Sequence, residues 1–271
     1  MEIGKKRVVQ LRGKADKPFY LVPLGDVHLL SEACSTSTLK ETITWIARRP
    51  DVLWIGMGDY ADYIGYKDNR FDPTVIDKAL AVADLAKIGD KSIEVVEEYF
   101  KPIAGKCLGM LYGNHEDAYQ QRQTSGELHG KLCARLGVQN LGYSCFQELE
   151  FRRGKESFTY VIRAHHGAGW AASKGGKLNR LKQFAQQTTA DLTLVGHLHD
   201  ILMYPDIQLF PDGGRIRQRV KLAIMTGTYL RTYSHGITTY AERKGYDPAP
   251  LGSPRIPLYP FGEKTIGDVI T

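Results

Sequence analysis

Cysteine is scarce in this sequence, and long hydrophobic runs are missing from it. Only 4 of the 271 residues are cysteines, and no two are spaced as Cys-x-x-Cys. Such a sparse set does not form the disulfide framework of a secreted scaffold, so we expect a reducing, cytoplasmic setting. No apolar run reaches the ~18 residues of a membrane helix, and the charged N-terminus has no apolar stretch typical of a signal peptide. These absences predict a cytoplasmic protein that does not enter a membrane.

The sequence also lacks a large excess of either charge, internal repeats and a Ser/Pro-rich linker. Lysine and arginine number 36 against 30 acidic residues, which gives a net charge of +6. A content of 42% hydrophobic and 24% charged residues is ordinary for globular proteins and excludes a disordered chain. We therefore expect a single domain over residues 1–271. The modest positive charge is compatible with a polyanionic partner such as nucleic acid. Nothing in the sequence indicates an oligomeric state.

Short β-rich apolar runs alternate with helical patterns through the first 200 residues. The expected strands are 19–24, 52–57, 107–112, 158–164 and 191–195. The expected helices are 37–49, 74–88, 92–100 and 177–187. This alternation predicts an α/β fold, and the nearly continuous apolar runs predict strands that are covered on both faces.

The character of the chain changes in residues 200–271. Two β-like runs flank the turn residues 211–214 and predict a β-hairpin. In its second arm Arg215, Arg217, Arg219 and Lys221 alternate with Ile216, Gln218, Val220 and Leu222, which predicts one wet basic face and one packed face. The stretch 247–262 is rich in proline, so we expect it to wrap around the surface without regular structure.

Most of the chemically active side chains fall in five short segments, each at the end of an expected strand. The segments are Gly25–His28, Gly58–Asp62, Gly113–Glu116, His165–Gly167 and Gly196–His199, and they hold six of the eight histidines. Because ligands bind beyond the carboxyl ends of strands in open α/β sheets, we expect one polar cluster. Asp-x-His and His-x-His spacings point two side chains the same way in extended backbone. Carboxylate, imidazole and amide groups without thiolate suit Mn²⁺, Fe or Zn²⁺.

These segments resemble, in order, the signature blocks of the calcineurin-like metallophosphoesterases: D-x-H, G-D-x-x-D, G-N-H-[DE], H-G and G-H-x-H. All five blocks occur in that order over residues 25–199. The resemblance implies a four-layer αββα sandwich with a dinuclear metal site at the carboxyl ends of the strands. It also implies two divalent cations, with Mn²⁺ favoured and Fe, Zn²⁺, Ni²⁺ or Mg²⁺ as alternatives.

The resemblance assigns a role to individual residues of the five segments. Asp59 would bridge the two metals. The other ligands would be Asp26, His28 and His199 for the first metal, and Asn114, His166 and His197 for the second. His165 is the alternative to His166, which is preferred because it directly precedes the small residue of its turn. His115 matches the catalytic histidine that contacts the scissile phosphate or protonates the leaving oxygen. Asp62 matches the second acidic residue of its block, and a role in orienting a ligand suits it better than ligation.

The reaction implied is phosphoester hydrolysis by a hydroxide that bridges two metals ~3.5–4 Å apart. We expect a phosphodiesterase or nuclease that acts on DNA or another nucleic acid. The alternatives are a phosphomonoesterase on nucleotides or phosphoproteins, and a metal-dependent scaffold without catalysis. Lys174, Lys177 and Arg180 follow the His166 segment and either contact substrate phosphates or lie on a solvated helix start. Trp170 either stacks on a base of the substrate or has only a structural role.

Overall fold

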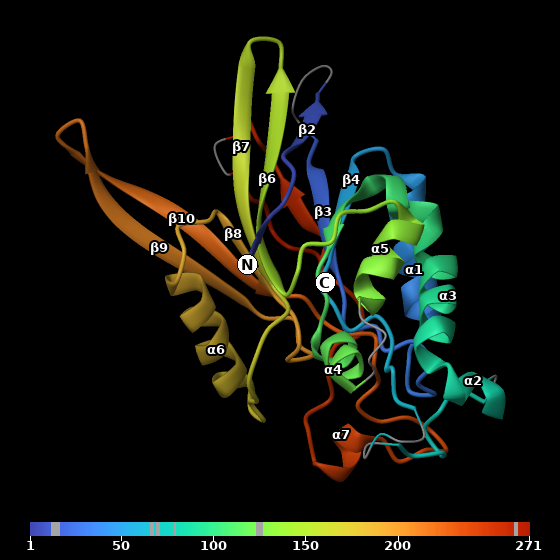
Figure 1. Ribbon diagram of the computed structural model, residues 1–271. Helices are drawn as coiled ribbons and strands as arrows, with labels where there is room; N and C mark the ends of the chain where they lie inside the picture. The colour runs from blue at the N-terminus through green and yellow to red at the C-terminus, as the bar shows by residue number, and fades with distance from the viewer. Residues whose placement is uncertain (12–16, 66–67, 69–70, 79, 123–126, 263–264) are drawn as a thin grey trace.

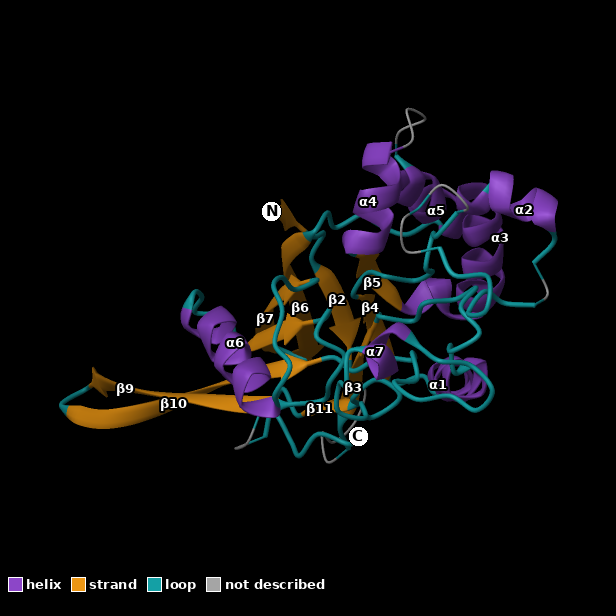
Figure 2. Ribbon diagram, turned by 90° about the horizontal axis from the view of Figure 1, so that it is seen from below, coloured by secondary structure: helices purple, strands orange, loops and turns teal. Residues whose placement is uncertain are grey.

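Two β-sheets pack face to face at the centre of the protein, and helices cover their outer faces (Figures 1 and 2). This computed structural model describes residues 1–11, 17–65, 68, 71–78, 80–122, 127–262 and 265–271. One outer layer contains α1, α3 and α5, and the other contains α6 (Figure 1). The order helix, sheet, sheet, helix is that of the expected αββα sandwich, so the prediction of the fold class is confirmed.

The larger sheet has seven strands in the order β1-β6-β7-β8-β10-β9, with β2 also paired to β6. Its strands are β1 (Glu2–Ile3), β2 (Arg7–Gln10), β6 (Ser144–Arg153), β7 (Glu156–His165), β8 (Leu192–Val195), β9 (Met203–Asp212) and β10 (Arg215–Met225). The smaller sheet has the order β11-β3-β4-β5. Its strands are β3 (Phe19–Leu24), β4 (Val52–Gly56), β5 (Cys107–Met110) and β11 (Ile256–Leu258). Strands β3, β4 and β5 are parallel, as are β7, β8 and β10, so their carboxyl ends share one rim.

The helices connect these strands and flank the sandwich. They are α1 (Thr36–Arg48), α2 (Val82–Ala86), α3 (Ile88–Phe100), the 3₁₀ helix η1 (Lys101–Lys106), α4 (Asn114–Arg122), α5 (Leu128–Leu136), α6 (Lys174–Gln186) and α7 (Tyr240–Arg243). Within the described residues, no helix combines the length and the hydrophobicity that crossing a bilayer requires.

The buried strands contribute side chains to two separate cores, as their continuous apolar sequences predict. In β4, Leu53 and Ile55 lie in the core between the sheets, whereas Val52 and Trp54 lie in the core under the helices. This alternation follows from the period of two along a strand. Trp54 stacks on Phe100 of α3 with ring centroids 5.4 Å apart. Its indole N–H donates to the carbonyl oxygen of Ile103 at 2.7 Å, which satisfies the buried polar atom.

The β9–β10 hairpin corrects one expectation, because its distal half projects away from the sandwich (Figure 2). Ile216 and Val220, on the face expected to be packed, are 81% and 49% exposed. Lys221, on the face expected to be wet, is buried and pairs with Asp206 at 2.7 Å. The apolar face is exposed because no helix or second sheet extends over it in the described structure.

Two further segments differ from the sequence predictions. The helix expected over 74–88 is reduced to α2, because the preceding segment pairs with the loop after β3 instead. Ile76 forms a bridge with Ser31, and the carbonyl of Val75 accepts a hydrogen bond from the backbone of Glu32. The proline-rich C-terminal stretch does contain regular structure. Its strand β11 pairs antiparallel with β3 at the edge of the smaller sheet.

Candidate metal centre

The five motif segments meet at the rim of the sandwich from which α4 begins (Figure 1). Asp26 and Asp59 follow β3 and β4 of the smaller sheet, and His197 follows β8 of the larger sheet. Hydrogen bonds join the segments. The backbone N–H of Asp26 donates to the carbonyl oxygen of Gly58 at 2.9 Å. The N–H of His197 donates to the Asp26 carboxylate at 3.0 Å. The rim is therefore built from both sheets, and the buried Asp26 side chain holds them together.

A first group of potential ligands consists of Asp26, His28 and His199, whose ligand atoms all lie within 4.8 Å of one another. The Nε2 atoms of His28 and His199 are 3.1 Å apart. The Nε2 atom of His199 is 3.3 Å from Oδ1 of Asp26. These are the three side chains expected to hold the first metal.

A second group adjoins the first and consists of Asp59, His166 and His197, again within 4.8 Å. The amide oxygen of Asn114 lies 3.0 Å from Nε2 of His166 and 2.8 Å from Nδ1 of His197. Nε2 of His166 is 3.3 Å from Oδ2 of Asp59. The structure thus brings the four side chains expected at the second metal to one place.

The outer nitrogens of these histidine rings fix which inner atoms face the centre. Nδ1 of His166 bonds the carbonyl of Met57 at 2.7 Å, and Nε2 of His197 bonds the carbonyl of Gly169 at 2.9 Å. A carbonyl oxygen only accepts, so these two nitrogens carry the hydrogens. In the neutral form of each ring, the inner nitrogen then faces the Asn114 oxygen with a lone pair. Three acceptor atoms, Oδ1 of Asn114, Nε2 of His166 and Nδ1 of His197, then converge without a donor, which fits a cation. A ligand set made only of oxygen and nitrogen atoms fits Mn²⁺, Fe or Zn²⁺.

The backbone at this rim adopts the left-handed conformation, which residues other than glycine rarely take. Positive φ angles of 48–70° occur at five residues with chemically active side chains, namely Asp26, His28, Asp59, His197 and His199. Each left-handed residue costs on the order of 1 kcal/mol or more, and such strain concentrates at functional sites.

The electrostatics of the rim favour a positive charge at its centre. Burial raises the pKa of Asp59, but the charges of His166 and His115 outweigh it and hold this pKa well below its usual value. Burial likewise opposes ionisation of Asp26, and the bond and charge of His199 still lower its pKa. Burial lowers the pKa of His166, yet Asp59 raises it overall, to about 10. Two buried carboxylates thus require compensating positive charge, which a bound cation supplies.

His115 and Asp62 lie beside the first group. The carboxylate of Asp62 accepts a hydrogen bond from Nδ1 of His28 at 2.7 Å, which turns Nε2 of that ring toward Asp26 and His199. Nδ1 of His115 donates to the backbone carbonyl of Asp62 at 2.8 Å. The backbone N–H of His115 donates to Oδ1 of Asp59 at 2.9 Å. Asp62 therefore orients the ring of His28, and His115 borders the centre.

Of the two adjacent histidines, the structure places His166 in the centre and turns His165 away. The ring of His165 packs against Phe184 of α6, with centroids 4.8 Å apart, and accepts a bond from the backbone of Gly167. His129, outside the motifs, is fully buried and donates to the carbonyl of Met110 at 3.0 Å. Its ring lies parallel to that of Tyr60, which gives it a packing role.

Glu116 is a residue of the rim to which the sequence analysis assigned no role. Its buried carboxylate accepts backbone hydrogen bonds from Asp59 at 3.0 Å, Tyr60 at 2.9 Å and Gly113 at 2.9 Å. Burial and the charge of Asp59 raise the pKa of Glu116 to about 7. Glu116 thus ties the loop after β4 to the loop after β5. The only signal for it in the sequence was its place in the Gly113–Glu116 motif.

The four expected substrate contacts follow β7 and take different positions. Trp170 and Lys174 are exposed, and Arg180 is half-buried on α6. The expectation that Lys177 contacts substrate or lies on a solvated helix start is wrong, because its buried ammonium donates to the Asp200 carboxylate at 3.1 Å. This pair fixes α6 to the segment after His199 and withdraws Lys177 from any substrate. Lys174, Arg180 and Trp170 remain predictions as substrate contacts.

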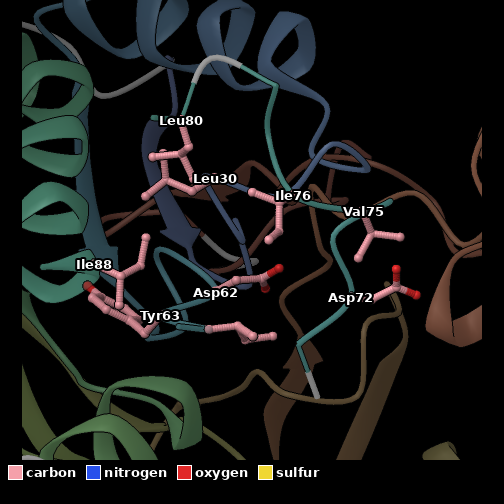
Figure 3. Close-up of a pocket in the computed structure, with 9 residues that line it drawn as sticks. Leu30, Asp62, Tyr63, Asp72, Val75, Ile76, Leu80 and Ile88 are labelled. Carbon is pink, nitrogen blue, oxygen red and sulfur yellow. The ribbon is translucent and has the colours of Figure 1, made fainter. Parts of the chain in front are cut away.

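A small cavity lies behind Asp62 (Figure 3). It has a volume of ≈ 20 Å³, room for about one water molecule, so it is no substrate pocket. Its lining is mainly apolar, from Leu30, Tyr63, Ile64, Val75, Ile76, Leu80 and Ile88, with Asp62 and Asp72 as the acidic members.

Comparison with known proteins gives weak similarities of shape only. No protein-family model matches the sequence, and no curated protein matches it. Among solved structures, the chain is similar to wild-type Vps29 complexed with zinc from Entamoeba histolytica, with 11% identity and a TM-score of 0.41 over 93% of this chain and 98% of that chain. It is also similar to a predicted phosphoesterase from Streptococcus pneumoniae TIGR4, with 13% identity and a TM-score of 0.30 over 80% of this chain and 76% of that chain.

Proposed function

We propose that this protein, whose motifs match the calcineurin-like metallophosphoesterases in order and meet at one rim, is a metal-dependent phosphodiesterase that hydrolyses nucleic acid. The observation that carries the proposal is the convergence of two adjoining ligand groups, Asp26, His28 and His199 beside Asp59, His166 and His197. The carboxylate of Asp59 lies 3.3 Å from His166 and accepts the backbone N–H of His115. Two adjoining sets of carboxylate and imidazole groups suit a pair of divalent cations.

The residues of the chain have distinct tasks in this hydrolysis. Asp26, His28 and His199 would hold one cation, Asn114, His166 and His197 the other, and Asp59 both. When bound, the cations would supply an activated water and neutralise the charge on the phosphoryl oxygens. Asp62 orients His28 through the 2.7 Å bond to Nδ1. His115 stabilises the charge that develops on the phosphoryl group, or carries a proton to the leaving oxygen through Nε2. Water adds to phosphorus, the P–O ester bond breaks, and the leaving oxygen takes the proton.

Three features support a diester of nucleic acid as the substrate. The chain carries a net charge of +6. The Arg180 guanidinium lies against Gly169, whose carbonyl bonds His197, so a positive charge stands next to the second ligand group. Lys174 begins α6 beside the same loop. Positive side chains so placed can bind the phosphates that flank a scissile bond.

The proposal is tested with the manganese-loaded protein on bis(p-nitrophenyl) phosphate and p-nitrophenyl phosphate. Hydrolysis that favours the diester is expected, followed by cleavage of single-stranded DNA, duplex DNA or RNA in the same buffer. A large preference for the monoester would identify the phosphomonoesterase alternative. If the protein binds two metals per chain and hydrolyses no phosphoester, the proposal is overturned in favour of a scaffold. The His115→Ala variant serves as the control for contaminating phosphatase activity.

A further inference from the structure

Three aromatic side chains form a row on the surface beside the candidate metal centre. Trp170 lies in the loop after β7, and Tyr240 and Tyr246 lie in the segment that contains α7. The ring centroids of Trp170 and Tyr246 are 6.3 Å apart, and those of Tyr246 and Tyr240 are 6.4 Å apart. Trp170 is 68% exposed and Tyr240 is 66% exposed. These three residues are called the aromatic row.

The rings of the aromatic row are not stacked face to face on one another. The indole N–H of Trp170 donates to the hydroxyl oxygen of Tyr246 at 2.5 Å, so the indole meets its neighbour with an edge. The ring planes of Trp170 and Tyr246 are inclined by 50°, and those of Tyr246 and Tyr240 by 80°. Exposed aromatic rings whose faces are not stacked on each other are suited to stack on a ligand.

The aromatic row is connected directly to the second ligand group. Gly169, the residue before Trp170, accepts the hydrogen bond from Nε2 of His197 at 2.9 Å. The Arg180 guanidinium packs on this glycine so closely that a Cβ there would lie 2.1 Å from Nη2. Figure 1 shows α7 below the start of α4, on the same rim. The row therefore extends outward from the centre, with a guanidinium at its inner end.

Contacts of the C-terminal segment, within itself and with the loop after β4, hold the outer part of the row in place. The hydroxyl of Tyr233 donates to the carbonyl oxygen of Tyr246 at 3.0 Å. Arg243 of α7 pairs with Asp72 at 2.8 Å. The ammonium of Lys244 lies 5.7 Å from the centroid of the Tyr240 ring. The row is thus held before any ligand arrives, and a positive charge stands at its outer end as well.

We infer that the aromatic row binds the unpaired bases of single-stranded nucleic acid whose backbone passes the metal centre. This inference rests on the proposed function, because it supplies the substrate class for that centre. Bases of any sequence present a π face, and stacking on an aromatic ring contributes ~1–3 kcal/mol per base. Arg180 and Lys244 are placed to meet phosphates at the two ends of the row. Bases in a duplex are already stacked inside it and cannot use these rings.

The experiment measures binding in the absence of divalent cations, so that nothing is hydrolysed. Fluorescence anisotropy of a labelled oligothymidylate is compared with that of an abasic oligomer of equal length, which carries the same phosphates without bases. The preference of the wild-type protein for the oligothymidylate is expected to fall roughly tenfold in Trp170→Ala and in Tyr240→Ala. Trp170→Phe, which retains an aromatic face, is expected to restore most of it. Phe210→Ala removes an exposed aromatic ring from the distant β9–β10 hairpin and serves as the matched control.

Two competitors separate the possible sources of the bases. A duplex of equal length and thymidine monophosphate are each added against the labelled oligomer, and both are expected to compete more weakly than the unlabelled single strand. Equal competition by either one would overturn the assignment to single strands. An unchanged preference for bases in Trp170→Ala and Tyr240→Ala, or an equal loss in Phe210→Ala, would overturn the role of the row.

These outcomes are distinguishable from failure of the proposed function. Binding is read without metal and without turnover, whereas the proposed function fails when the manganese-loaded protein leaves bis(p-nitrophenyl) phosphate intact. A wild-type protein that hydrolyses the baseless diester but shows no preference for bases would retain the proposed function and lose this inference.

Discussion

The buried carboxylate of Glu116 accepts the backbone N–H of Asp59 at 3.0 Å, across 57 positions of the sequence. The same carboxylate oxygen accepts the N–H of Gly113 at 2.9 Å, one residue before Asn114. Glu116 therefore sets the spacing between a side chain expected to bridge two metals and one expected to bind the second. Glu116 is in neither group of potential ligands and contacts Asp59 only through the backbone, so it acts as a positioning residue.

Replacing Glu116 with glutamine is expected to weaken metal binding while the ligand set stays intact. The amide nitrogen of glutamine donates, so at least one backbone N–H of the two loops loses its acceptor inside the protein. An unsatisfied buried donor costs ~1–3 kcal/mol. Calorimetric titration with Mn²⁺ should show weaker binding in Glu116→Gln, whereas Glu98→Gln, an exposed site on α3, should match the wild type. Equal affinities in all three proteins would contradict the positioning role.

Variants of Asp59 and His115 should separate metal binding from turnover. Asp59→Asn removes a buried charge proposed to serve both metals, so the purified protein should carry less of both. His115→Ala should keep the metals and lower kcat by ~10²–10⁴, the usual contribution of a positioned acid or electrostatic group. Elemental analysis and hydrolysis of bis(p-nitrophenyl) phosphate decide between the outcomes. Full metal content in Asp59→Asn would contradict its shared position.

Removal of the metals is expected to destabilise the whole fold, because the ligand groups come from both sheets. A cation at 100 times its Kd stabilises the folded state by about 2.7 kcal/mol. For a chain of this length that corresponds to a rise of several degrees in the melting temperature. Thermal unfolding with and without Mn²⁺ measures the difference. The melting temperature of Asp59→Asn should rise less with Mn²⁺ than that of the wild type. An identical rise in both proteins would contradict this prediction.

His129 should contribute a fall in stability as the pH drops from 6.5 toward 4. Burial lowers the pKa of this histidine to about 4, so between pH 6.5 and 4 the folded state does not bind a proton that the unfolded state binds. Because the unfolded state binds more protons in this window, stability increases with pH through it, by roughly 3 kcal/mol in total. Urea unfolding at several pH values should show a smaller slope for His129→Gln than for the wild type. His235→Gln, at an exposed histidine, is the control, and equal slopes for all proteins would contradict the prediction.

The sequence was most informative where the chemistry or the burial is local. The apolar stripe of residues 37–49 predicts α1, observed at Thr36–Arg48, and the run 19–24 predicts β3 without error in its bounds. The five motifs also name the side chains that meet at the rim. Each of these signals lies within a few adjacent residues, so no knowledge of distant contacts is needed to see it.

The features that the sequence did not predict depend on distant partners. The sequence does not predict strand β6, because polar residues interrupt its apolar run, yet one of them is buried and bonds the segment between β1 and β2. The side chain of Gln147 donates to the carbonyl of Lys5 at 2.7 Å. Lys177 has the composition of a surface helix start, and only the fold reveals Asp200 beside it. The hairpin alternates like a packed strand, and no local pattern shows where its covering layer ends.

The left-handed backbone at Asp26, His28, Asp59, His197 and His199 has a consequence for the design of more stable forms of this protein. Glycine adopts that conformation at little cost, so a chain optimised for stability alone would carry glycine there. Substituting glycine at His199, whose ring is partly exposed, should therefore relieve backbone strain and remove a side chain expected to hold a metal. Thermal robustness and activity are opposed at these positions, and any stabilising redesign has to begin elsewhere in the molecule.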